Sequence, residues 1–514
     1  MDKADSVKKQ LNIVWLKRDL RSQDHASFQA AENSQVPYLS IFIFEPSIIS
    51  YPDTSLRHLQ FQYHSLLEMN IEFIEKNKKV ILFHAEAMEV FRFLHQQFDI
   101  KNIFSYQESG IQLTYDRDIL LTQFFKINSI TWIEFQRDGI IRKLKNRSDW
   151  DKKWFETMHQ PMIHNTYQYQ AAIIFQNPYE IQKDFLQKLI EYPTQMQPAG
   201  EKYGLQYLQS FLQSRGYNYS KHISKPLLSR TSCARISPYL AWGNLSIRQV
   251  YQHTLVATKD IKLKRPFQNF LSRLHWHCHF IQKFEMECRY EKECINKGYE
   301  LIEREERNDL IDAWKNGNTG VPIVDACMKC LHATGWINFR MRALVVSFLT
   351  HHLFQDWRKG VYFLAQQFLD YEPGIHYPQF QMQAGTTGIN MIRVYNPVKN
   401  SLEHDEQALF IKKWLPQLAN LPLSFIHQPW LMTSMDERLY NFKLGLDYPK
   451  PVIDLENNLK INTDKLWAIR KNEMVIAENK RIIETHTRKK TKSFSTKKKA
   501  QVLTHKNIQT LFNQ

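Results

Sequence analysis

Short apolar runs alternate with helical-period stretches over the first quarter of the chain. The runs lie at residues 12–16, 38–44, 80–83, 103–106 and 130–135. Between some of them, residues 56–76 and 87–98 carry apolar side chains at helical spacing. Alternation of strands and helices is typical of a doubly wound parallel sheet. We therefore expect an α/β domain over residues 1–135.

The pattern changes after this first domain. Residues 136–200 show no clear period, and we interpret them as a connector that wraps on the surface and contains some helix. From residue 201 to residue 450 the pattern is helical throughout, which predicts one large all-α domain. Residues 451–514 form a C-terminal extension.

Composition agrees with a folded chain and leaves its partner open. The 514 residues are 43% hydrophobic and 13% aromatic, which is typical of a well-packed globular protein and excludes a disordered one. The formal net charge is +16. A polyanionic partner would explain this charge, and so would a basic surface kept for solubility.

Several compartments and architectures are disfavoured. The chain has no run of about 18 apolar residues, so we expect no membrane span. Its charged amino terminus is not followed by a stretch of the signal-peptide kind. Six cysteines in a chain of this length do not suggest a disulfide framework. We therefore expect a protein of a reducing compartment, which is the cytoplasm or, in a eukaryote, the nucleus.

Charged residues interrupt the helical pattern between residues 314 and 357. Asp325, Arg340 and Arg342 stand where a simple bundle would carry leucine or alanine, and Asp370 follows further on. A buried charge must be paired or must hold a ligand, because desolvating it alone costs several kcal/mol. These helices therefore either enclose a polar ligand or carry ion pairs that only join neighbouring helices.

A second cluster suggests a metal-dependent nucleic-acid enzyme. His275 and His279 are four residues apart, a spacing that places both on one helix face, and several cysteines lie further along. No acidic general base stands between the two histidines, and Cys327 and Cys330 fall in an apolar helical stretch. We interpret the thiols as buried and the histidines as polar pocket residues, and we expect no metal.

The order and spacing of many residues resemble the DNA photolyase/cryptochrome family. The resemblance covers nearly the whole chain. It includes the opening strand and charged turn and the loop that contains Ser237 and Gly243. It also includes the charged helical run described above and two closing segments. These lie at residues 13–21, 235–243, 314–358, 395–397 and 414–416.

This resemblance implies that the all-α domain binds FAD in a bent conformation. It assigns the pyrophosphate to Ser232, Arg235 and Ser237, and it pairs Arg342 with Asp370. The full set of implied cofactor-binding residues is Tyr219, Ser232, Arg235, Ser237, His277, Phe280, Arg342, Asp370, Tyr371 and Glu372. In this family the first domain can carry a second, antenna chromophore. Its identity and even its presence stay open here, because Thr114 replaces the glutamate that marks a folate site.

The implied reaction is light-driven electron transfer from reduced FAD to a UV-induced pyrimidine dimer that is flipped out of DNA. Trp276 would stack on the flipped bases or, alternatively, belong to the core, and Arg340 would hold flanking phosphates. His376 falls where the family places the residue facing flavin N5, and Trp357 is the middle member of its electron relay. Cyclobutane dimers are favoured over (6-4) products, the partner is UV-damaged DNA, and we expect a monomer.

Several positions depart from the family pattern and support a second hypothesis. Phe339, Arg273 and Met382 replace residues of the usual lesion pocket. Phe380 and Arg304 replace the outer tryptophans of the relay, so photoreduction must use another route. The alternative is therefore a cryptochrome-like blue-light photoreceptor with little or no repair activity.

The C-terminal extension is strongly basic. Between residues 479 and 500 the only acid is Glu484, and the Lys/Arg positions are 480, 481, 488, 489, 490, 492, 497, 498 and 499. Blocks of like charge are usually solvated and disordered, which is what we expect here. The alternative is a tail that adds sequence-independent attraction to DNA phosphates.

Overall fold

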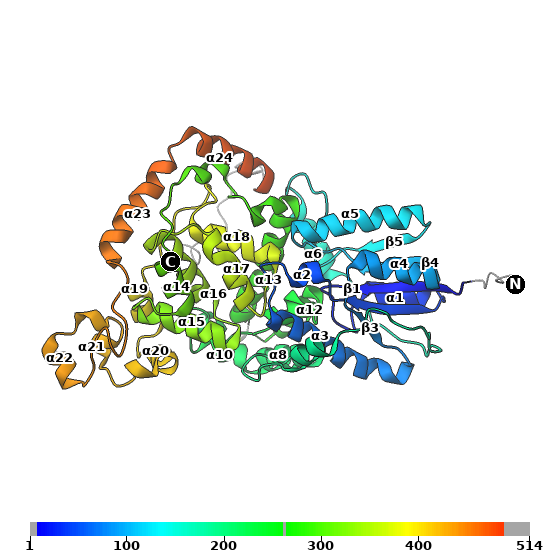
Figure 1. The fold of residues 1–514 in the computed structure, drawn as a ribbon, viewed down its shortest axis with the longest axis horizontal. Helices are drawn as coiled ribbons and strands as arrows, with labels where there is room; N and C mark the ends of the chain where they lie inside the picture. Colours follow the sequence, from blue (N-terminus) through cyan, green and yellow to red (C-terminus); the bar gives the residue numbers. More distant parts are fainter. Residues whose placement is uncertain (1–7, 261–263, 488–514) are drawn as a thin grey trace, which may run out of the picture.

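The computed structural model describes residues 8–260 and 264–487. Its first part contains a parallel sheet in the order β3-β2-β1-β4-β5, so the prediction of a doubly wound sheet is confirmed. Figure 1 shows this sheet on the right and the helical part of the molecule on the left. The strands are β1 (Gln10–Leu16), β2 (Tyr38–Ile43), β3 (Val80–Phe83), β4 (Asp99–Tyr106) and β5 (Thr131–Phe135).

Alternate residues of β1 supply two different cores. Val14 and Leu16 pack with α1 and α3, whereas Ile13 and Trp15 pack with α4 and α5. This follows from the two-residue period of a strand, whose side chains point to opposite faces. The sheet is therefore covered on both faces by α1 (Ala26–Asn33), α3 (Leu56–Phe73), α4 (Ala87–Gln97) and α5 (Gln112–Ile127), with short α2 (Pro46–Ile49) and η1 (Ile74–Lys76) beside them.

The segment expected to be a connector contains two helices separated by extended chain. These are α6 (Trp150–His159) and α7 (Lys183–Ile190), and residues 161–177 have no helix or strand. α6 packs against α12, and α7 packs against α3. The segment thus touches both the sheet domain and the helical part.

The described residues between 201 and 450 form helices and no strand. The first of these are α8 (Glu201–Gln213), η2 (Arg215–Asn218), α9 (Tyr219–His222), α10 (Ser229–Ser232), α11 (Ser237–Ala241), α12 (Ile247–Ala257), α13 (Lys264–Met286), η3 (Cys288–Glu291) and η4 (Lys297–Leu301). Then follow α14 (Asn308–Asn316), α15 (Pro322–Thr334), α16 (Phe339–Ser347), η5 (Phe348–His352), α17 (Arg358–Gln367), α18 (Pro373–Ala384), α19 (Pro397–His404), α20 (Leu409–Trp414), η6 (Pro416–Leu418), α21 (Leu423–Ile426), η7 (Pro429–Leu431) and α22 (Ser434–Leu439).

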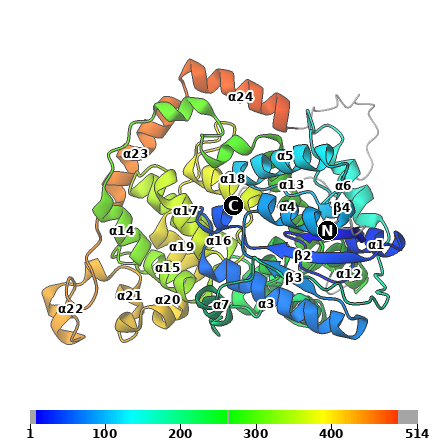
Figure 2. The same ribbon diagram turned by 45° about the vertical axis from the view of Figure 1, so that its right-hand side comes forward.

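The C-terminal extension is more ordered than its charge suggested. Helices α23 (Leu455–Ile469) and α24 (Glu473–His486) run along the outside of the helical part (Figures 1 and 2). α24 buries Val475, Ile482 and His486, and Arg481 pairs with Glu287. The expectation of disorder is therefore wrong for residues 479–486, because an apolar face of that segment docks on the core. The remaining basic positions, from 488 onward, lie outside the described residues.

A loop of the helical part is pressed against the end of β1. Gly243 has a φ of +76°, and a Cβ placed there would lie 2.1 Å from the backbone oxygen of Arg18. The Arg21 guanidinium donates to the Gly243 carbonyl oxygen at 3.1 Å, and the Leu20 amide donates to the Trp242 carbonyl oxygen. Only glycine fits so close an approach with this backbone conformation.

None of the described helices is long and apolar enough to cross a membrane.

Alanine substitutions at Gly243 and Gly445 should separate the cost of backbone strain from the cost of a steric clash. Gly445 also has a positive φ, of +93°, but a Cβ there would meet only the Lys450 side chain, at 3.5 Å. We expect Gly445→Ala to lower the free energy of unfolding by about 1–2 kcal/mol from left-handed strain alone. Gly243→Ala should cost at least about 3 kcal/mol, because backbone collision adds to the strain. Urea unfolding measures both, and equal losses would show that the Gly243 contact is not tight.

Candidate functional site

A largely buried ion pair joins α16 to the turn before α18. The Arg342 guanidinium, on α16, donates to Asp370 Oδ2 at 2.8 Å, and it lies over the Phe368 ring, 4.0 Å from the ring centroid. The Asp370 side chain is only 4% exposed, and Arg342 is 27% exposed. The other oxygen of Asp370, Oδ1, is buried and has no hydrogen-bond partner among the described residues. The site thus presents one carboxylate oxygen that a polar ligand can engage.

His376 lies on α18, close to this pair. Its Nε2 is 2.8 Å from the Val361 carbonyl oxygen, and burial lowers its pKa to about 4. The imidazole is therefore neutral near pH 7, with the proton on Nε2, because a carbonyl oxygen can only accept. Aromatic rings surround it, and the nearest is Tyr371, at 5.4 Å.

The long helix α13 brings further residues of the predicted site to the same region. It packs against α18, where a Cβ on Gly374 would come within 2.8 Å of the Ile281 Cα atom. On α13 the half-buried Trp276 ring lies 5.8 Å from the Phe280 ring. Burial lowers the pKa of His277, and its Nε2 has no hydrogen-bond partner in the described parts of the chain.

Arg235 is held in place by neutral groups. Gln197 Oε1 accepts from its Nη2 at 2.8 Å, and the Trp336 ring lies 4.0 Å from the guanidinium carbon. Burial lowers the pKa of Arg235 to about 10. No carboxylate of the described residues pairs with this cation, so its charge is available to an anionic ligand. Ser232 lies nearby in sequence, and its hydroxyl hydrogen-bonds with His222 Nδ1 at 2.7 Å.

Three other predicted residues have mainly structural neighbours. Tyr219 is buried against Phe270, at a ring distance of 5.8 Å. Ser237 begins the short helix α11 and is half-buried. Arg340, at the start of α16, lies 5.7 Å from the Tyr395 ring.

Tyr371 and Glu372 turn away from Asp370. The Tyr371 hydroxyl donates to Asp53 Oδ2 at 2.5 Å, and Glu372 Oε2 accepts from Arg137 at 2.9 Å. Both partners come from the first 137 residues of the chain. Tyr371 also lines a cavity, and its hydroxyl is committed to Asp53. Glu372 keeps one buried oxygen, Oε1, without a partner among the residues described.

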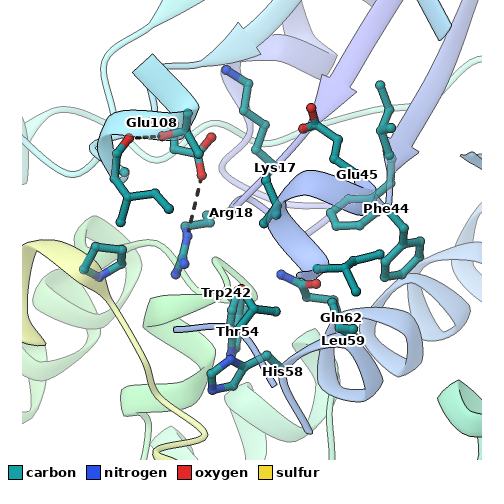
Figure 3. Close-up of a pocket in the computed structure, with 18 of the residues that line it drawn as sticks. Lys17, Arg18, Phe44, Glu45, Thr54, His58, Leu59, Gln62, Glu108 and Trp242 are labelled. Carbon is teal, nitrogen blue, oxygen red and sulfur yellow. Dashed lines mark hydrogen bonds and ion pairs between the residues drawn. The ribbon is translucent and has the colours of Figure 1, made fainter. Parts of the chain in front are cut away.

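The cavity that Tyr371 lines lies at the carboxyl ends of the strands. Figure 3 shows Lys17, Arg18 and Glu108 on the sheet side and His58 and Trp242 opposite them. This is the point in the strand order where β1 and β4 are neighbours, and open parallel sheets bind ligands at such switch points. The lining also includes Glu45, Asp53, Thr114, Arg117 and Tyr371.

Charges in this cavity are arranged as a network. Arg117 donates to Glu45 at 2.6 Å and to Glu108 at 2.8 Å. Although burial opposes it, the cations Arg117, Lys17 and Arg18 lower the pKa of Glu108 to about 2. The sequence reasoning missed Arg18, Glu45 and Asp53 as site residues. The charged turn directly after the first strand was the signal that could have found Arg18.

Two of the residues that depart from the family pattern, Arg273 and Phe339, are in contact with each other. The Arg273 guanidinium carbon lies 5.6 Å from the Phe339 ring, and Phe339 is 42% exposed. In the relay region, the Phe380 ring is 5.8 Å from the His376 ring and 6.4 Å from the Trp357 ring. Trp357 is fully buried, and Arg304 pairs with Asp356 at 3.8 Å.

The histidine and cysteine cluster does not assemble into a metal site in the described residues. No group of three His, Cys, Asp or Glu side chains with suitable geometry occurs in residues 8–260 and 264–487. His275 Nε2 is instead 2.8 Å from Asp151 Oδ1, and Cys327 and Cys330 are buried.

Comparison with known proteins identifies the family. Residues 12–144 match a family model described as DNA photolyase, and residues 270–468 match one described as the FAD binding domain of DNA photolyase. The chain belongs to the DNA photolyase/cryptochrome family. The Arg342–Asp370 pair lies within the region that matches the FAD binding domain, and Arg18 and Glu108 of the cavity lie within the other matched region.

Relatives within this family have different names. A deoxyribodipyrimidine photo-lyase of Alkalihalophilus pseudofirmus is 34% identical over 50% of this chain, and the match spans about half (53%) of that relative. One of Buchnera aphidicola is 27% identical and covers 88% of this chain and 95% of the relative. The solved Synechocystis sp. PCC6803 cryptochrome has a TM-score of 0.79 at 21% identity, covering 89% of this chain and 99% of that one, which shows a shared fold.

The residues present fit the FAD that the matching family model names. An arginine fork without a carboxylate partner suits a diphosphate, and Arg235 is such a group. Buried polar atoms without partners cost about 1–3 kcal/mol each. Asp370 Oδ1 and His277 Nε2 are two such atoms, and each can accept a hydrogen bond from or donate one to a polar ligand.

Two buried neutral histidines, His58 and His376, make stability depend on pH. Burial lowers the pKa of His58 to about 3 and that of His376 to about 4, from 6.5. As the pH falls below about 6.5, only the unfolded chain binds these protons, so each histidine lowers stability by up to about 1.4 kcal/mol per pH unit until its folded pKa is reached. Urea titrations at pH 7, 6 and 5 measure this loss. The double variant His58→Gln/His376→Gln should show a shallower decline, and an identical decline would contradict the assignment.

Proposed function

We propose that this protein splits UV-induced pyrimidine dimers in DNA, using light and reduced FAD, with cyclobutane dimers as the favoured substrate. The observation that carries the proposal is the Arg342–Asp370 pair, which leaves one buried carboxylate oxygen open beside α13 and α18. Photolyase names among relatives that match most of this chain support the same reaction.

The chain contributes binding and positioning of the cofactor. Ser232, Arg235 and Ser237 would hold the pyrophosphate, and Asp370, His277 and Phe280 would hold the rest of the molecule. Bound FAD in its reduced form supplies the electron for dimer splitting. His376 would face the flavin as a neutral ring that withholds a proton, because its Nε2 proton is committed to Val361 and its Nδ1 carries none.

DNA would be bound on the face that carries Trp276. A lesion that stacks poorly costs less to flip out of the duplex, and an aromatic ring can receive it. Trp276 is half-buried at the site, and the exposed Phe339 ring offers a second apolar surface. Arg340 and Arg273 would hold phosphates, in keeping with the net charge of +16.

The cavity at the carboxyl ends of the strands is the proposed site of a second chromophore. Trp242 and His58 supply ring surfaces, and the charges of Arg18, Glu45 and Arg117 surround them. Extraction of the purified protein and mass analysis of the released small molecules would identify this chromophore.

One observation favours a second function, that of a blue-light photoreceptor. Arg273 and Phe339 contact each other at the positions where dimer-repairing members contact the lesion. A receptor would show a light-dependent change in protease sensitivity of its C-terminal region and would bind damaged DNA no better than undamaged DNA.

A repair assay separates these functions. Purified protein with pre-reduced flavin is illuminated with blue light in the presence of oligonucleotides that carry a cyclobutane dimer or a (6-4) product. Restoration of intact thymines from the cyclobutane dimer is the expected result. Absence of restoration from either lesion contradicts the proposal.

Removal of the Arg342 charge should weaken FAD binding. Arg342→Met leaves Asp370 buried without its cation, and such truncations cost 2–5 kcal/mol. Since Arg342 is 27% exposed, we expect about 2 kcal/mol, which is roughly a 30-fold weaker FAD affinity. Arg342→Lys keeps the charge and should lose less. Fluorescence titration of the flavin-free protein measures both, and unchanged affinity in Arg342→Met would remove the pair from the site.

Trp276 tests the lesion pocket. Stacking contributes about 1–3 kcal/mol per base, so Trp276→Ala should weaken binding of dimer-containing DNA about 5- to 150-fold. Trp276→Phe keeps an aromatic face and should lose less. Affinity for undamaged DNA is the control, because phosphate contacts do not involve the indole. Equal losses for damaged and undamaged DNA would place Trp276 in the core instead.

A further inference from the structure

A line of tyrosine rings leads from His376 to the surface of the molecule. The ring of Tyr377 lies 5.6 Å from the His376 ring, and the Tyr362 ring lies 6.4 Å from Tyr377. Tyr51 is next, 6.3 Å from Tyr362. Neighbouring tyrosine rings pack edge to face, at interplanar angles of 82° and 87°. Because each ring lies within 6.4 Å of the next, the line is continuous, although its members come from α18, α17 and the chain after α2.

Exposure increases along this line. Tyr377 is fully buried, whereas Tyr362 and Tyr51 are half-buried. The line thus begins beside the proposed flavin site and ends where a small molecule in solution can reach it.

Carboxylates accept hydrogen bonds from the first and last tyrosines. The Tyr377 hydroxyl donates to Asp53 Oδ2 at 3.3 Å, and the Tyr51 hydroxyl donates to Glu291. A phenol gives up an electron readily only if its proton leaves at the same time, because the oxidised phenol is a strong acid. Burial raises the pKa of Asp53, which makes its carboxylate a better proton acceptor. A buried tyrosine without such a base would not serve this purpose.

The other aromatic branch from His376 starts with a poor electron donor. It runs through Phe380 to Trp357, with ring distances of 5.8 and 6.4 Å. A phenylalanine ring has no hydroxyl and is much harder to oxidise than a phenol or an indole. An electron from Trp357 would therefore have to pass Phe380 without using it as a carrier.

We propose that Tyr377, Tyr362 and Tyr51 form a proton-coupled path that delivers electrons to the bound flavin. This inference rests on the proposed function, because it requires FAD at the site. It adds three residues that donate or relay the electrons needed to bring oxidised cofactor to its working state.

Each step of the path balances in electrons and protons. Tyr377 gives one electron to the light-excited oxidised flavin and its hydroxyl proton to Asp53. Tyr362 then supplies an electron to Tyr377, which regains its proton from Asp53, and the half-buried Tyr362 releases its own proton to water. Tyr51 then gives an electron to Tyr362, which takes a proton back from water, and Glu291 accepts the Tyr51 proton. A thiolate in solution returns one electron to Tyr51, which regains its proton from Glu291, and two of the resulting thiyl radicals combine to a disulfide.

The test is a light-induced radical signal in the full-length protein with oxidised FAD bound. Electron paramagnetic resonance is recorded after blue-light illumination in the presence of a thiol, on protein grown with ordinary or ring-deuterated tyrosine. We expect a neutral tyrosyl radical whose spectrum narrows on deuteration. Tyr377→Phe should abolish this signal, and Tyr362→Phe should abolish the thiol-dependent photoreduction that is measured by loss of oxidised flavin absorbance.

A matched control is provided by Tyr115. Its hydroxyl also donates to a carboxylate, that of Glu285, at 2.5 Å, but no ring contact in the described chain joins it to His376. Tyr115→Phe should keep both the radical and the photoreduction. All three variants remove only a hydroxyl, so retained flavin absorbance shows that each is folded.

Two outcomes would overturn the path. A tryptophanyl radical that disappears in Trp357→Phe, with photoreduction intact in Tyr362→Phe, assigns the electrons to the other branch. A preparation that holds no flavin contradicts the proposed function itself, and with it this path. The first result leaves flavin binding and repair untouched, so the two failures are distinguishable.

Discussion

The helical part of this molecule depends on satisfying charge inside a low-dielectric interior. Asp370 sits among apolar helices with only a few per cent of its side chain exposed, and its bond to Arg342 compensates part of the cost. The ion pair leaves Asp370 Oδ1 without a hydrogen bond. A polar ligand that bonds to this oxygen would lower the cost of the buried charge, so ligand binding should stabilise the folded state of this region.

Three consecutive residues, Asp370 to Glu372, contact two different sites of the molecule. Asp370 faces the helices that would hold FAD, whereas Tyr371 and Glu372 reach partners in the first 137 residues, Asp53 and Arg137. One short segment thus connects the flavin site with the cavity at the carboxyl ends of the strands. Gly243 is a further contact between the two parts of the chain. Only a residue without a Cβ allows its loop to pack against the Arg18 backbone. The two parts of the chain are consequently positioned by direct contact and not by a flexible linker.

The sequence patterns predicted the sheet well, because the apolar run of each strand is a local feature that can be recognised without knowing the rest of the fold. The alternation of Ile13 and Trp15 with Val14 and Leu16 determines which residues face which core, whatever lies far away in sequence. The direction of the Tyr371 hydroxyl and the bond from His376 to Val361 could not be predicted in this way, since both depend on long-range packing. The helix α24 was not predicted for a similar reason. The block of basic residues suggested disorder, whereas Val475 and Ile482 of this helix are buried against the core.

The central claim is that charges buried among these helices hold FAD. The most direct measurement is the absorbance spectrum of the purified protein, before and after incubation with FAD and removal of the excess, with the released flavin quantified per chain. The account predicts a flavin spectrum and stoichiometric FAD. A colourless protein that takes up no FAD would contradict it.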